Sequence, residues 1–236
     1  MKVFSVRLEE MSIFLFIGII AVGIYFTEQR GKGFVPAMMP TMSKTIVIDA
    51  GHGGWDPGKK GTVGENEKII NLQIAQKLAV YLEQGGAVVY MTRNTDEALG
   101  KKKRADMKER ETITNESEGD ILISIHQNSF PTGSIKGAQV FYHKQSEEGQ
   151  RLAESIQTSL TTFVDPENTR AIKANNDYYI LRTTKIPAAL VECGFLSNGG
   201  EEQLLNEEMY QEKMAWGIYM GIMEYFSEEK GGAKAL

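Results

Sequence analysis

Two histidines and two carboxylates occupy positions in this chain where they could act together in catalysis. His52 follows an apolar run in "IVIDAGHGG", His126 ends the run "ILISIH", and Glu192 ends "AALVE". Glu67 comes soon after the glycines, where we expect a helix to begin. Two imidazoles and one carboxylate are a common ligand set of catalytic zinc, which keeps a fourth position for water. A carboxylate that is not a ligand can take a proton from that water and pass it to a leaving group.

Each of these residues also has a purely structural interpretation. The flanking glycines leave His52 little to pack against, which favours a ligand over a turn cap. His126 could equally be a buried histidine with satisfied hydrogen bonds. Glu67 could simply complement a helix dipole, and Glu192 could pair with Arg182 or Lys185. The residue types alone therefore leave the ligand set open.

Composition excludes several other functions. The net charge is -5 and the pI is about 5.4, so the chain has no general affinity for polyanions. The one basic cluster, "KKKR" at 101–104, is followed closely by Asp106, Glu109 and Glu111, which we expect to offset it. We therefore predict no nucleic-acid partner. Cys193 is the single cysteine, which excludes an internal disulfide, and we expect it to be a small buried residue.

Apolar runs alternate with amphipathic segments from residue 45 onward. We predict strands in "KTIVIDA", "AVVYMT", "DILISIH", "GAQVFYH" and "AALVECGF". We predict helices from Glu67 to the glycines at 85 and 86, over 106–116, over 147–163 and over about 207–226. This order predicts an α/β fold, a single domain in which helices flank both faces of a mostly parallel or mixed sheet. Because ligands collect at the carboxyl ends of such strands, His52, His126 and Glu192 should share one edge.

The N-terminal segment predicts export. Residues 11–26, "MSIFLFIGIIAVGIYF", form an uncharged apolar run after Lys2 and Arg7. We assign 1–28 to a signal anchor or a cleaved signal peptide, 29–44 to a linker, 45–228 to the catalytic domain and 229–236 to a polar tail. The catalytic domain would then face the cell wall from a membrane anchor, or be secreted after cleavage of the signal.

Several short blocks, in order over about 45–226, resemble the zinc-dependent N-acetylmuramoyl-L-alanine amidases of bacterial cell walls. These blocks are "IDAGHGGWDPGKKG", "ENEKIINLQIAQKL", "YMTR", "ISIHQNS" and "PAALVECGFLSN". The resemblance implies that Zn²⁺ is held by His52, Glu67 and His126, and that Glu192 is the catalytic carboxylate. It also implies substrate-binding or supporting roles for Asn128, Arg93 and Arg110. Lys59 and Lys60 add charge to the first loop relative to the family pattern.

The implied reaction is hydrolysis of the amide between the lactyl group of N-acetylmuramic acid and the L-alanine of the peptidoglycan stem peptide. We expect the glycines around His52 to leave room for this bulky, branched substrate. The layout is similar to the germination-specific branch of the family in spore-forming Firmicutes, which prepares spore cortex for muramic lactam formation. That similarity implies action in the forespore intermembrane space, with an activating lipoprotein or a deacetylase of the same cortex as partner.

Two alternatives remain at this stage. The first is a peptidoglycan-binding module that is non-catalytic or needs a partner for activity. The four intact candidate residues, His52, Glu67, His126 and Glu192, argue against loss of catalysis. The second is a zinc carboxypeptidase acting on the stem peptide, which would share the same chemistry and differ in the walls of its pocket.

Overall fold

The computed structural model describes residues 39–232, so the predicted signal segment, residues 29–38 of the predicted linker and residues 233–236 of the predicted tail lie outside the described residues. Within 39–232, no helix combines the length and the apolar character needed to cross a membrane.

Six strands and six helices follow one another in the described chain. The strands are β1 (Thr45–Ala50), β2 (Val88–Met91), β3 (Ile121–Asn128), β4 (Gln139–Tyr142), β5 (Lys173–Ala174) and β6 (Ala188–Phe195). The helices are α2 (Glu67–Gln84), α3 (Lys103–Glu116), α4 (Glu147–Phe163), α5 (Tyr179–Thr183), α6 (Gly199–Leu205) and α7 (Glu208–Gly232). The five predicted strands and four predicted helices are all present, although α3 begins three residues before the predicted position. The short elements β5, α5 and α6 were not predicted.

The strands form one mixed sheet in the order β2-β1-β3-β6-β4-β5. Neighbours from β2 to β6 are parallel, β4 runs antiparallel to β6, and β5 runs parallel to β4. All eight residues of β6 and most of β1 and β3 are buried, as expected for central strands with both faces covered. The predicted single-domain α/β fold with a mixed sheet is therefore confirmed.

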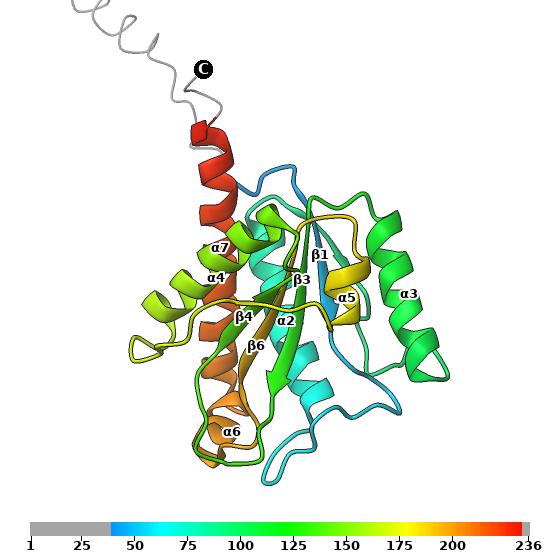
Figure 1. Ribbon diagram of the computed structural model, residues 1–236, viewed down its shortest axis with the longest axis vertical. Coiled ribbons are helices and arrows are strands. Elements are labelled where there is room, and N and C mark those ends of the chain that lie inside the picture. The colour runs from blue at the N-terminus through cyan, green and yellow to red at the C-terminus, as the bar shows by residue number, and fades with distance from the viewer. Residues whose placement is uncertain (1–38, 233–236) are drawn as a thin grey trace, which may run out of the picture. The chain divides into compact units, whose positions relative to one another are not determined.

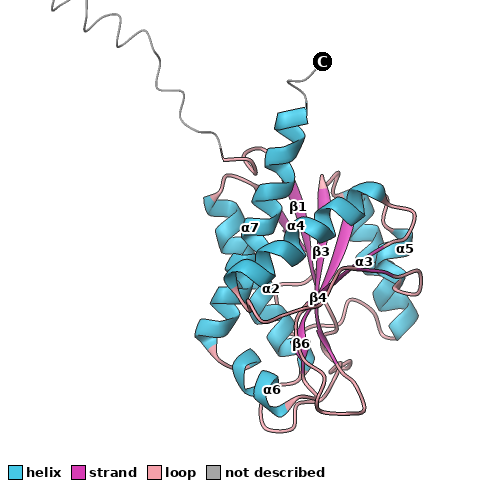
Figure 2. Ribbon diagram, turned by 60° about the vertical axis from the view of Figure 1, so that its left-hand side comes forward, coloured by secondary structure: helices cyan, strands magenta, loops and turns pink. Residues whose placement is uncertain are grey.

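Helices α2, α4 and α7 cover one face of the sheet, and α3 and α5 cover the other (Figures 1 and 2). The larger core lies on the α2, α4 and α7 face. The four apolar residues spaced four apart along α2 are completely buried there, namely Ile70, Ile74, Leu78 and Leu82. A smaller cluster lies on the other face, where Val47, Leu122 and Leu190 of the sheet meet Ile180 and Leu181 of α5. These two cores fix the strands whose ends carry the candidate site.

The carboxyl ends of β1, β3 and β6 lie side by side at one edge of the sheet, at the bottom of Figure 1. His126 of β3 and Glu192 of β6 are direct neighbours across the ladder. The amide of Gly51, just after β1, donates to the carbonyl of Ile125 at 3.1 Å. The strand register therefore brings the segments carrying the two histidines and Glu192 together, as predicted from their positions at strand ends.

Candidate active site

The side chains of His52, Glu67 and His126 meet at the carboxyl ends of β1 and β3. Oε1 of Glu67 lies 3.1 Å from Nε2 of His52 and 3.0 Å from Nδ1 of His126. One potential ligand atom from each of the three side chains lies within 4.8 Å of the other two. Two imidazole nitrogens and a carboxylate oxygen at this spacing match the donor set that zinc prefers in catalytic sites.

Glu67 is ionised although it is buried. Its side chain is 5% exposed, and burial alone would raise the pKa of the carboxyl group. Hydrogen bonds and charge from His126 and His52 outweigh burial and move the pKa far below its usual range. The backbone amides of Lys59 and Gln127 also donate to this carboxylate, at 2.7 Å and 3.1 Å. Such a buried carboxylate is suited to bind a cation rather than to stabilise a helix end, so the dipole interpretation of Glu67 is insufficient.

His52 is held in an unusual backbone conformation. Its φ angle is 63°, in the left-handed region that non-glycine residues rarely adopt. Two buried arginines bind the carbonyls around it. Arg110 donates to Ala50 O at 2.8 Å and to His52 O at 2.5 Å, and Arg93 donates to Ala50 O at 2.8 Å and to Gly51 O at 3.0 Å. The side chains of Arg93 and Arg110 thus support the His52 loop.

Arg110 is itself part of a buried ionic network. It pairs with Asp49 at 2.7 Å and with Asp106 at 2.7 Å. Asp49 also accepts hydrogen bonds from Ser124 and Thr92, at 2.7 Å and 2.8 Å. Burial alone would raise the pKa of Asp49, but Arg110, His126 and Ser124 together lower it to about 2. In this network the buried guanidinium of Arg110 is paired with two buried carboxylates, so none of these three charges beneath the site is left without a partner of opposite sign.

The glycines near His52 make room for protein atoms, which corrects the expectation that they make room for substrate. A Cβ on Gly51 would lie within 3.0 Å of the His126 ring. A Cβ on Gly58 would be 2.5 Å from Oε2 of Glu67, and one on Gly54 would be 2.6 Å from the amide of Ala98. Glycine at 51 and 58 therefore allows the candidate ligands themselves to approach the backbone.

The carboxylate of Asp56 lies beside the His52 imidazole, a contact that was not identified from the sequence. Its Oδ2 lies 2.9 Å from Nδ1 of His52 and 2.5 Å from Nζ of Lys103. Burial would raise the pKa of Asp56, but Lys103 and His52 outweigh burial and lower it to about 2. A carboxylate at one imidazole nitrogen leaves the other nitrogen, Nε2, to face Glu67 and a metal.

Glu192 lies beside the three candidate ligands, but only one of its two carboxylate oxygens is hydrogen-bonded within residues 39–232. The phenol of Tyr178 donates to Oε1 of Glu192 at 3.1 Å, whereas the buried Oε2 has no hydrogen-bond partner within the described chain. Burial raises the pKa of Glu192 to about 6; the charge of His126 opposes this shift and that of Glu67 adds to it. Its hydrogen-bond partner is therefore Tyr178 rather than the arginine or lysine considered from the sequence. A carboxylate poised near neutral pH suits proton transfer.

A cavity of about 500 Å³ contains the site. Its lining includes all four candidate residues, His52, Glu67, His126 and Glu192, together with Asn128 and Tyr178. Asn128 is half-buried there, and its side-chain oxygen accepts from the amide of Ser129 at 2.8 Å. Cys193 is completely buried, and burial raises the pKa of its thiol, which argues against a nucleophile.

Comparisons with known proteins agree with this arrangement. The family model described as N-acetylmuramoyl-L-alanine amidase matches residues 46–224. The germination-specific N-acetylmuramoyl-L-alanine amidase of Bacillus subtilis (strain 168) is 37% identical over 203 residues, which cover 82% of this chain and 84% of that protein. The CwlD amidase from Clostridioides difficile, solved in complex with the GerS lipoprotein, is 41% identical with a TM-score of 0.76, over 79% of this chain and 100% of that one. A second amidase structure, from Clostridium difficile 630, is 34% identical with a TM-score of 0.73, over 79% of this chain and 98% of that one. The chain therefore belongs to the N-acetylmuramoyl-L-alanine amidase family and carries that amidase activity.

Proposed function

We propose that this amidase is zinc-dependent, with His52, Glu67 and His126 as the ligands and Glu192 as the proton-transfer group. The observation that carries the proposal is the meeting of two imidazoles, an ionised carboxylate and a second, partly unsatisfied carboxylate in one cavity. Zinc bound there would polarise the amide carbonyl, acidify a water molecule and stabilise negative charge in the transition state.

The protein's own contribution is proton transfer and positioning. The free Oε2 of Glu192 accepts a proton from the attacking water as the new carbon–oxygen bond forms. Glu192 then gives that proton to the alanine nitrogen as the carbon–nitrogen bond breaks, which yields a lactyl carboxylate and a free amine. Tyr178 donates to the other oxygen of Glu192, and the carboxylate of Asp56 lies 2.9 Å from Nδ1 of His52. The same carboxylate thereby serves both steps, because its raised pKa lets it exist in both states near neutral pH.

The test is mass spectrometry of peptidoglycan after incubation with the purified protein, with zinc present and with zinc chelated. We expect zinc-dependent release of stem peptides that begin with a free L-alanine amine. Glu192→Gln, with zinc bound, serves as the matched inactive control. Equal release after complete removal of metal would contradict the zinc assignment, and release of carboxyl-terminal amino acids instead would indicate a carboxypeptidase.

We further propose that the natural substrate is spore cortex peptidoglycan, reached from an exported position outside the membrane, and that a lipoprotein activates the enzyme. Similarity to a germination-specific amidase and to an amidase solved in complex with the GerS lipoprotein supports this proposal. A deletion strain should form spores whose cortex lacks muramic lactam, and cell fractionation should recover the protein with the envelope. Spores with normal muramic lactam would contradict the cortex role.

A further inference from the structure

Asn71 is a completely buried amide on a helix face that is otherwise apolar. It lies four residues after Glu67 in α2, so the two side chains share one face of the helix. The residues that follow on this face, Ile74, Ala75 and Leu78, are fully buried in the larger core. Burying an amide among apolar side chains is unfavourable unless its polar atoms are hydrogen-bonded. The hydrogen bonds of Asn71 must therefore offset the cost of its burial.

These hydrogen bonds reach each of the three segments that carry a candidate metal ligand. Nδ2 of Asn71 donates at 3.1 Å to the carbonyl of Gly51, the residue before the first histidine. The same nitrogen donates to Oε1 of Glu67 at 3.4 Å, the longest of these contacts. Oδ1 of Asn71 accepts at 3.1 Å from Nε2 of Gln127, the residue after the second histidine. Both partners of Nδ2 are acceptors, so the contacts agree with a single orientation of the Asn71 amide.

Gln127 closes this set of contacts behind the site. Its side chain is buried, and its backbone amide donates to Oε1 of Glu67 at 3.1 Å. Gln127 therefore contacts Glu67 through its backbone and Asn71 through its side chain. A displacement of the Asn71 amide would disturb Glu67 and the end of β3 together.

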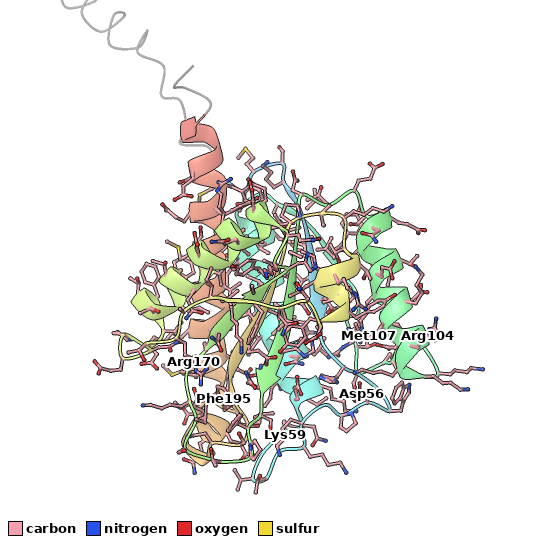
Figure 3. The ribbon with its side chains drawn as sticks, in the orientation of Figure 1. Asp56, Lys59, Arg104, Met107, Arg170 and Phe195 are labelled. Atoms are coloured by element: carbon pink, nitrogen blue, oxygen red, sulfur yellow. The ribbon has the colours of Figure 1, made fainter. Side chains whose placement is uncertain are left out.

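The position of α2 relative to the strand ends is not set by the sheet. The loop of residues 51–66 connects β1 to α2 without a helix or strand of its own. It runs past Asp56 and Lys59, which are labelled toward the bottom of Figure 3. Sheet register aligns the ends of β1 and β3, whereas α2 packs across the face of the sheet. The position of Glu67 relative to the two histidines therefore depends on side-chain contacts such as those of Asn71, one turn into α2.

We propose that Asn71 is a positioning residue for the metal site, acting through Glu67 and through the segments that carry His52 and His126. The proposal rests on the zinc site proposed above. Side chains that hydrogen-bond to metal ligands orient those ligands, and loss of one typically lowers metal affinity by about 10- to 100-fold. Asn71 is completely buried and is not part of the cavity lining, so its effect should fall on metal binding rather than on contact with substrate.

The test compares two variants of the full-length protein that each remove a buried amide. Asn71→Ala removes the side-chain contacts described above, and Gln157→Ala is the matched control. Gln157 of α4 is buried; its Oε1 accepts from the amide of Val140 at 2.9 Å, and its Nε2 donates to the carbonyl of Ala138 at 3.3 Å. These partners lie in or beside β4, which carries none of the candidate ligands. Both variants should lower the unfolding midpoint of the metal-free protein, because each leaves buried polar groups without a partner.

Metal binding separates the two variants. In competition with a chelating dye, Asn71→Ala should bind zinc at least about tenfold more weakly than the unmodified protein, whereas Gln157→Ala should be unchanged. The visible absorption of the Co²⁺-loaded protein gives a second readout, because it reports coordination geometry. At saturating Co²⁺ the spectrum should change in Asn71→Ala and stay the same in Gln157→Ala. Gln127→Ala, which keeps its backbone contact with Glu67 but loses the one with Asn71, should also weaken zinc binding and provides the test if Asn71→Ala does not fold.

Two results would overturn the positioning role. One is zinc affinity in Asn71→Ala equal to that of the unmodified protein. The other is an equal loss of zinc affinity in Gln157→Ala, which would show that any buried amide has this effect through stability alone. Failure of the unmodified protein to bind zinc would instead count against the proposed zinc site, and the role of Asn71 would fall with it.

Discussion

The phenol of Tyr178 donates a hydrogen bond to Oε1 of Glu192 at 3.1 Å, while Oε2 of the same carboxylate is buried without a partner. The Tyr178 ring is held by an edge-to-face contact with Phe141, with 5.3 Å between ring centroids. This relationship makes the two oxygens of Glu192 unequal, since one is fixed by the protein and the other is left for the substrate and water.

Replacing Tyr178 with phenylalanine should move the acid limb of the rate profile to higher pH. Burial raises the pKa of Glu192 to about 6, and the Tyr178 hydrogen bond opposes that rise because it favours the charged form. Without the hydrogen bond from Tyr178, the pKa of Glu192 rises further. Glu192 is then protonated at a higher pH, so kcat begins to fall at a higher pH on acidification. We expect a shift of up to about one pH unit, with little change in KM. The measurement is kcat against pH.

Tyr179→Phe is the matched control for this prediction. Tyr179 lines the same cavity, but its hydroxyl donates to Glu111 rather than to Glu192. The acid limb of the kcat profile of Tyr179→Phe should coincide with that of the unmodified enzyme. A lower kcat for Tyr178→Phe with an unshifted limb would mean that Tyr178 only supports packing.

Much of the site could be predicted because it depends on strand order. His52, His126 and Glu192 each follow an apolar run, and parallel strands bring their carboxyl ends to one edge. Glu67 was identified only through family resemblance, since the start of a helix is a common place for a carboxylate. The structure adds the physical reason, which is its position between the two imidazoles.

The residues that were missed belong to segments without a regular period. Tyr178 precedes the short helix α5, within a stretch whose sequence predicted only irregular structure. Asp56 lies in the loop after β1 and contacts His52, whose φ angle is positive. Neither contact follows from residue spacing, because tertiary packing of loops decides both.

Glu192→Gln should abolish turnover without loss of zinc or stability. The variant keeps the shape of the side chain but cannot accept a proton, so we expect kcat to fall by at least about 100-fold. The raised pKa means that the carboxylate form of Glu192 disfavours folding by about 2 kcal/mol, a penalty that appears as pH rises from 4.5 to about 6. Glutamine carries no charge, so thermal stability at pH 7 should be equal or higher. His126→Ala should lose both zinc and activity, and retained turnover in either variant would contradict the assigned roles.

Asp56→Asn should weaken zinc binding more than it slows the zinc-saturated enzyme. The carboxylate lies 2.9 Å from Nδ1 of His52, and loss of a charge partner at a ligand's other nitrogen typically lowers metal affinity by about 10- to 100-fold. The measurement is zinc affinity by competition with a chelating dye, together with kcat at saturating zinc. Asp96→Asn is a suitable control, because Asp96 binds Lys68 and the amide of Gly54 but not a candidate ligand. Unchanged zinc affinity in Asp56→Asn would show that the ring is fixed by other contacts.

Arg110→Met should destabilise the fold, since it leaves two buried carboxylates without their cation. Arg110 is 1% exposed and pairs with both Asp49 and Asp106. Removing one partner from a buried ion pair typically lowers the free energy of unfolding by about 3–5 kcal/mol. Arg104→Met, an exposed position in the same helix, should change it by less than about 0.5 kcal/mol. Denaturant unfolding at pH 7 compares the two, and equal stability would contradict the role given to the buried network.

Gly51→Ala should displace His126 and thereby lower zinc affinity, although position 51 carries no ligand. The added methyl group would lie within 3.0 Å of three atoms of the His126 ring, closer than side chains tolerate. Because Gly51 is not among the glycines with positive φ, the effect comes from the close approach rather than from backbone strain. Gly199→Ala is the control, since a Cβ there would meet nothing within 4 Å. We expect Gly51→Ala to bind zinc at least tenfold more weakly and to lose most of its activity, with Gly199→Ala unaffected. Normal zinc affinity in Gly51→Ala would contradict this account and support the earlier expectation that Gly51 makes room for the substrate.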